Sequence, residues 1–189
     1  MEKTKWLAIF DLSGIQRFIF ATNKMKEIIG GSTVVHNALF KELPEITGES
    51  PDKWLNGDFS FSDDEAQIVY IGGGNALVVF CSEEKYKSAA RELGKTVFLN
   101  SGGALRLASA CTQIDIDEDN SLGKIQKALM AKLDAAKKAG GNTSSSGVLP
   151  IVAYDNNNYE PLVLTRSGAM PLSKQKKLEA EKPAMSSAI

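Results

Sequence analysis

A run of three glycines joins two strand-forming segments near the middle of the chain, in the sequence IVYIGGGNALVVF. Both flanks, residues 66–71 and 75–81, are rich in β-branched or other apolar residues, so they are predicted to pair as a hairpin. A tight turn needs positive φ at no more than two positions, yet Gly72, Gly73 and Gly74 are all glycine. The triplet fits either a tight turn or a backbone surface that a ligand can approach closely.

The segments around this hairpin alternate between strand and helix patterns. A buried strand is predicted over residues 5–12, and a helix with the sequence IQRFIFATNKMKEI follows it. After the hairpin, Ser82 and two glutamates start another helix, and residues 104–116 alternate as a strand. The order strand, helix, hairpin, helix, strand predicts an α+β fold, a ferredoxin-like βαββαβ unit with an antiparallel sheet and helices on one face.

The sequence GGS at residues 30–32 interrupts the first helical pattern. We expect a turn there, with Ser32 as the N-cap of a second helix, TVVHNALFKEL, that ends before Pro44. Residues 44–65 are turn-rich and acidic and are expected to form a surface excursion.

The C-terminal part of the chain carries extra elements. A helix is predicted over residues 120–139, where Leu122, Ile125, Leu129 and Leu133 form an apolar stripe. We then expect a flexible loop (GGNTSSSG), a short edge strand (VLPIVAY), and a solvated charged helix with a tail. Residues 1–149 are interpreted as one domain, and residues 150–189 as an extension that either belongs to it or begins another module.

The composition narrows the classes of function. The 189 residues include 22 Lys and Arg and 23 Asp and Glu, so the net charge gives no general reason to bind nucleic acid or an anionic membrane. The first apolar run is too short for a signal peptide, and no segment is long enough to span a membrane, which favours a cytoplasmic location. Cys81 and Cys111 are interpreted as core thiols, His36 as structural or surface-exposed, and DIDEDN at 115–120 as a solvated turn.

A candidate site follows from the predicted topology. Asp11 closes the first strand, and in a ferredoxin-like sheet that strand lies beside the hairpin strand that begins at Asn75, so Asp11 and residues 72–75 should meet. There the carboxylate can hold a metal ion while exposed amides approach phosphate oxygens. Ser13, Gly14 and Gln16 follow the same strand end, and Gly30, Gly31 and Ser32 form a second candidate phosphate-binding turn, although helix capping alone explains Ser32.

Three motifs, FDLSGIQRFIF, KEIIGGSTVV and VYIGGGNALVVF, occur in this order along the chain. Over about residues 5–140 the sequence resembles the first palm domain of the large polymerase-like subunit of type III CRISPR effector complexes, a relative of diguanylate and adenylate cyclases. The resemblance implies the ferredoxin-like palm derived above.

The resemblance also implies a function in antiviral defence. Palms of this family bind ATP, and two palms face to face join ATP into cyclic oligoadenylates after target RNA is recognised, with Mg²⁺ or Mn²⁺ as metal ion. The implied partners are a second palm or another protein of the effector complex, with guide and target RNA contacted indirectly and no membrane. The implied nucleotide-binding set is Asp11, Ser13, Gly14, Gln16, Gly30, Gly31, Ser32, Gly72, Gly73, Gly74 and Asn75, with Asp11 also as metal ligand.

The chain departs from the family at its metal-binding turn. The catalytic palm of the family has Gly-Gly-Asp-Asp at this turn, and Gly74 and Asn75 stand here where the aspartates would be. Two-metal catalysis needs several anionic ligands, so the resemblance implies a catalytically degenerate palm that holds a nucleotide for an active partner.

Two alternatives remain open at this stage. In the first, the sheet is a structural scaffold in an RNA-guided effector complex and binds no nucleotide. In the second, two copies form a homodimeric nucleotide cyclase in which Asp11 and acidic residues such as Asp63, Asp64 or Asp115 hold the metal.

Overall fold

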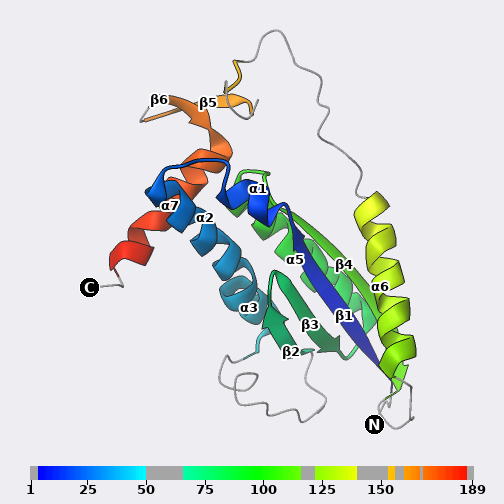
Figure 1. Ribbon diagram of the computed structural model, residues 1–189. Helices are drawn as coiled ribbons and strands as arrows, with labels where there is room; N and C mark the ends of the chain where they lie inside the picture. Colours follow the sequence, from blue (N-terminus) through cyan, green and yellow to red (C-terminus); the bar gives the residue numbers. More distant parts are fainter. Residues whose placement is uncertain are drawn as a thin grey trace.

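The computed structural model describes residues 4–49, 66–115, 122–139, 153–155, 160–166 and 168–186. Its centre is a four-stranded antiparallel sheet (Figure 1). The strands are β1 (Thr4–Ser13), β2 (Ala66–Gly72), β3 (Asn75–Phe80) and β4 (Arg106–Asp115), in the spatial order β2-β3-β1-β4. The predicted hairpin and the antiparallel α+β fold are therefore confirmed.

The two faces of the sheet carry different cores. One face packs against helices α2 (Met25–Asn37) and α5 (Glu83–Ser101), with Phe10 and Phe80 fully enclosed beside Leu93. The other face packs against α6 (Leu122–Ala139), where Leu129 and Leu133 contact a cluster that includes Ile9 and Ala110 from β1 and β4. The helices of the βαββαβ unit thus share one face as predicted, and the extra helix α6 covers part of the opposite face (Figure 1).

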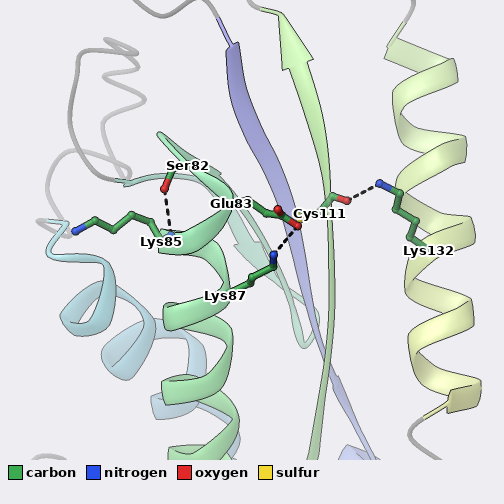
Figure 2. A network of polar contacts seen from close by, with 6 residues as sticks. All are labelled: Ser82, Glu83, Lys85, Lys87, Cys111 and Lys132. Carbon is green, nitrogen blue, oxygen red and sulfur yellow. Dashed lines mark hydrogen bonds and ion pairs between the residues drawn. The ribbon is translucent and has the colours of Figure 1, made fainter.

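Helix α5 begins as the sequence predicts. The Ser82 side chain accepts a hydrogen bond from the backbone N–H of Lys85 at 3.3 Å, which satisfies one of the free donors of the first turn (Figure 2). Glu83 pairs with Lys87 at 3.0 Å one turn further along. Local sequence signals are sufficient here because every partner lies within one turn.

The predicted turn at residues 30–32 is wrong. Helix α1 ends early (Ile15–Ile19), and α2 begins at Met25 and runs through Gly30, Gly31 and Ser32, so Ser32 is no N-cap. A Cβ on Gly30 would lie 1.8 Å from the backbone oxygen of Lys177 in α7 (Leu172–Ser186). The glycine therefore serves a close approach of two helices rather than a turn.

The expected helix end before Pro44 is also wrong. The chain continues from α2 through a π-helical turn, η1 (Ala38–Glu42), into α3 (Leu43–Thr47). Pro44 lies in the first turn of α3, where its missing N–H costs little. Gly48, at φ 72°, ends the helix, and most of the expected surface excursion (50–65) lies outside the described residues.

The sequence predicts a solvated C-terminal helix, and this prediction is wrong. Helix α7 packs against α2 (Figure 1), and its residues Ser173, Lys177 and Glu181 are buried. It follows a small hairpin of β5 (Leu162–Thr165) and β6 (Gly168–Pro171).

The expected loop at 140–147 and most of the strand expected at 148–154 lie outside the described residues, although Tyr154 forms an isolated bridge with Pro161. The domain division after residue 149 stays a prediction.

Charged groups line the contact between α7 and α2. Glu27 is 4% exposed and pairs with Lys174 at 3.6 Å. The Lys177 ammonium lies 4.6 Å from the centre of the Phe18 ring. Burial lowers the pKa of Lys177 below its ordinary 10.5, although the charges of Glu27 and Glu160 oppose the shift.

This shift gives α7 a pH-dependent contribution to stability. Above the folded-state pKa of Lys177 and up to about 10.5, the unfolded chain binds more protons than the folded chain, so the contribution of this lysine rises with pH. We expect the melting temperature of the parent minus that of Lys177→Met to increase between pH 8 and pH 10.5. Paired thermal melts would measure it, and a pH-independent difference would contradict the expectation.

Among the described residues, no helix combines the length and the apolar character needed to cross a membrane.

Candidate functional site

The strand register brings the end of β1 against the hairpin. Asp11 is the direct partner of Asn75, and Phe10 and Ile9 pair with Ala76 and Leu77. The backbone N–H of Leu12 donates to the Gly74 carbonyl at 2.8 Å, so the turn itself is held on β1. The predicted meeting of Asp11 with residues 72–75 is therefore observed.

Each of the three positions is glycine for a different structural reason. Gly73 (φ 61°) and Gly74 (φ 86°) are the two central residues of the turn, and positive φ at both is typical of the type I′ hairpin turn. A Cβ on Gly72 would lie 2.4 Å from the Tyr70 hydroxyl, and one on Gly74 would lie 2.5 Å from Cδ1 of Ile15. A Cβ on Gly73 would meet nothing within 4 Å. The expected bare backbone surface is therefore restricted to Gly73.

The Asp11 carboxylate has two partners in the structure. Its Oδ2 accepts a hydrogen bond from Ser13 Oγ at 3.3 Å and pairs with the Lys137 ammonium at 2.8 Å. The Asp11 side chain is 16% exposed and that of Lys137 is 37% exposed. A cation already lies against the carboxylate that was predicted to hold the metal.

Helix α6 positions this lysine by its register along β1. Leu133 packs in the cluster that contains Ile9, and Lys137 lies four residues after Leu133 just as Asp11 lies two residues after Ile9. Four helical residues rise about 6 Å and two strand residues about 6.6 Å. The rise from Leu133 to Lys137 thus matches that from Ile9 to Asp11, so packing of Leu133 beside Ile9 places Lys137 beside Asp11.

A second lysine fixes α6 on the edge strand. Lys132 Nζ donates to the backbone carbonyl of Cys111 at 2.9 Å, as Figure 2 shows. Strand β4 is an edge of the sheet, and a lysine bound to one of its carbonyls satisfies an acceptor on that edge. Two lysines of α6, Lys132 and Lys137, thus contact the sheet.

The other predicted site residues divide into two groups. Gly14, at φ 89°, precedes α1 and its carbonyl accepts from Phe18 N–H at 2.8 Å, while Gln16 is exposed on α1. Gly30 and Gly31 are buried and face α7 and α1, with Ser32 exposed on the same helix. The second candidate phosphate-binding turn is thereby corrected, because residues 30–32 are helical and offer no helix N-terminus.

The residues present do not fit a two-metal centre. Asn75 is neutral, Gly74 offers only backbone, and Asp11 is paired with a lysine. Within the described part of the chain, no three His, Cys, Asp or Glu side chains come together as a metal site.

Recruitment of Asp115 within one chain is excluded by the register. Asp115 pairs with Thr4, whereas Asp11 pairs with Ala108, so the two acids lie at opposite ends of β1 and β4. Seven strand residues span about 23 Å, too far for a shared ion. Asp63 and Asp64 lie outside the described residues.

Sequence reasoning missed two residues of this face. Lys137 continues the helical stripe of Leu129 and Leu133 by one further step of four, a spacing that could have identified it. Tyr70 pairs with Leu77, which pairs with Ile9, so its half-exposed ring lies on the α6 face of the sheet.

A hollow of about 380 Å³ lies at the other end of β1, and its lining includes none of the predicted site residues.

Comparison with known proteins gives structural relatives only. No protein-family model matches the chain, and no curated protein matches it. The apo Csm1–Csm4 cassette is similar with a TM-score of 0.52 and 19% identity, over 78% of this chain and 20% of that one. Csm1 of T. onnurineus is similar with a TM-score of 0.54 and 18% identity, over 74% of this chain and 20% of that one.

The chain therefore spans about a fifth of the length of these Csm1 relatives. The similarity confirms, at the level of the fold, the resemblance to the palm of the type III CRISPR large subunit.

Proposed function

We propose that this chain is a nucleotide-binding, catalytically degenerate palm that acts with an active palm in cyclic oligonucleotide synthesis. The pairing of Asp11 with Asn75, beside the open position of Gly73 on a sheet with palm topology, carries this proposal. The Lys137 ammonium adds a positive charge at the same strand end. ATP is the proposed ligand, held at the end of β1 and the turn.

The substitution of Asn75 and Gly74 for an acidic pair supports binding without turnover. Neutral groups hold a divalent ion far more weakly than carboxylates, and the chemistry of phosphoryl transfer depends on such ions. Labelled ATP incubated with the protein and manganese should therefore give no product in thin-layer analysis. A cyclic or linear product would favour the homodimeric cyclase instead.

Two substitutions at the open turn position test nucleotide binding. Gly73→Asn and Gly73→Asp are nearly isosteric, and both residues are accepted at positive φ in this type of turn. We expect calorimetry to show ATP binding by the parent and by Gly73→Asn, and about tenfold weaker binding by Gly73→Asp, which corresponds to about 1.4 kcal/mol of like-charge repulsion. Equal affinities of the Asn and Asp variants would place the phosphates elsewhere.

A second candidate function, a structural scaffold, is favoured by one observation. Tyr70 and Ile15 occupy the space beside Gly72 and Gly74, so two of the three glycines serve internal packing. One similar structure is a Csm1–Csm4 cassette, and a comparable protein partner for this chain is part of the scaffold proposal. A scaffold predicts no heat of binding with millimolar ATP and no shift of the melting temperature.

A further inference from the structure

We propose that Lys137 takes the place of a divalent cation at Asp11, so that the site binds a polyphosphate without a metal ion. The inference rests on the proposed nucleotide binding and names how that site holds its ligand. Its starting observation is the 2.8 Å contact between Lys137 Nζ and Asp11 Oδ2.

The geometry of the pair is that of a carboxylate and its bound cation. Asp11 lies near the C-terminal end of the central strand β1, its side chain is only 16% exposed, and Ser13 Oγ donates to the same oxygen. The Lys137 side chain is 37% exposed, which leaves its ammonium within reach of a second anion. An ammonium has three donors, so one can bind the carboxylate while the others bind phosphate oxygens.

The groups around Asp11 favour the lysine ammonium over a divalent metal ion as the bound cation. Opposite Asp11 stands Asn75, which contributes no charge, and a divalent ion would have to displace the lysine from the carboxylate. A hard divalent cation binds through several anionic oxygens, whereas a lysine needs a single carboxylate to fix its position.

The ion pair between Lys137 and Asp11 contributes little to the stability of the fold, and its main effect is on the charge at the turn. Ion pairs with an exposed partner contribute about 0–1 kcal/mol, so the fold does not depend on it. Its consequence is a fixed positive charge at the turn, supplied by a helix that the apolar contacts of Leu129 and Leu133 already hold on the sheet.

The first test measures ATP affinity by calorimetry with magnesium and with EDTA. The parent should bind with the same affinity within about threefold in both buffers, and Lys137→Met should lose at least tenfold in EDTA. Lys138→Met, at the exposed neighbouring position, is the matched control and should keep the parental affinity. A parent that loses tenfold or more in EDTA would overturn the proposal.

The second test needs no nucleotide. It follows Mn²⁺ binding by electron paramagnetic resonance in Asn75→Asp, which places a second carboxylate opposite Asp11, and in Asn75→Asp/Lys137→Met. The double variant should bind Mn²⁺ at least tenfold more tightly than Asn75→Asp alone, whereas Asn75→Asp/Lys138→Met should not. Equal Mn²⁺ affinities in the single and double variants would show that Lys137 does not compete for the cation site.

The two tests separate the failure of each claim. If the parent binds no ATP in either buffer but the Mn²⁺ result holds, nucleotide binding is wrong while Lys137 still occupies the cation position. If ATP binds but the Mn²⁺ affinities are equal, nucleotide binding stands and the role of the lysine is refuted.

Discussion

Gly30→Ala should lower the melting temperature by about 4–8 °C, although alanine is the better helix former. The added Cβ would lie 1.8 Å from the Lys177 carbonyl oxygen and 2.6 Å from its carbonyl carbon, so the backbone of α7 has to move. Overpacking costs about 1–3 kcal/mol, and more where backbone rather than a side-chain tip is displaced. Helix propensity returns at most about 1 kcal/mol, which leaves an expected net loss of about 2 kcal/mol, and for a chain of this size each kcal/mol lowers the melting temperature by about 2–4 °C.

The same substitution at two other helical glycines supplies the control. A Cβ on Gly31 would have its nearest neighbour at 3.4 Å, and one on Gly94 in α5 would have it at 3.9 Å, both ordinary contact distances. Gly31→Ala should change the melting temperature little, and Gly94→Ala should raise it slightly because the unfolded chain loses conformational freedom. Thermal unfolding of the three variants side by side would measure the contrast.

Hydrogen exchange in α7 distinguishes local destabilisation of this helix from destabilisation of the whole fold. If its packing on α2 is the part disturbed, backbone amides of α7 should exchange hydrogen faster in Gly30→Ala while the central strands keep their protection. A Gly30→Ala protein as stable as Gly94→Ala would contradict the close helix contact, and with it the interpretation of these glycines as a packing feature.

The sheet could be predicted from sequence because its signals are local. The hairpin is determined by the turn at Gly73 and Gly74, and α5 by the cap at Ser82, where each partner lies within a few residues. The sequence GGS at 30–32 shows the limit of such signals. Adjacent glycines fit a turn and a close helix contact equally well, and only the approach of Lys177 from the distant helix α7 decides between them.

The sequence predicts part of the candidate site: Asp11 and the turn, but not Lys137. The topology alone placed Asp11 beside residues 72–75, because β1 and β3 are neighbours in any ferredoxin-like sheet, and the structure adds the direct pairing with Asn75. Lys137 was not predicted, since its position depends on which face of the sheet α6 covers and on the register of Leu133 beside Ile9. The number of glycines suggested an open backbone, yet Tyr70 and Ile15 occupy most of that space.

Gly74→Val should destabilise the fold by about 2–4 kcal/mol, the largest effect expected of any change at the turn. Gly74 has φ 86°, a conformation that costs a β-branched residue about 1–3 kcal/mol. The new Cβ would also lie 2.5 Å from Ile15 Cδ1, and moving that side chain adds to the loss. The expected decrease of the melting temperature is about 4–16 °C.

Gly73→Asn is the matched control, because its added atoms enter open space and asparagine accepts the φ of 61° at this position. Its free energy of unfolding, measured by urea denaturation, should stay within about 1 kcal/mol of the parent. The two neighbouring glycines would then separate by function: Gly74 would determine stability, and Gly73 would be the one turn position where a substitution can affect a ligand without affecting the fold. Equal losses in both variants would show that the turn tolerates no side chain at either position, and the ATP comparison at Gly73 would then report on folding rather than on binding.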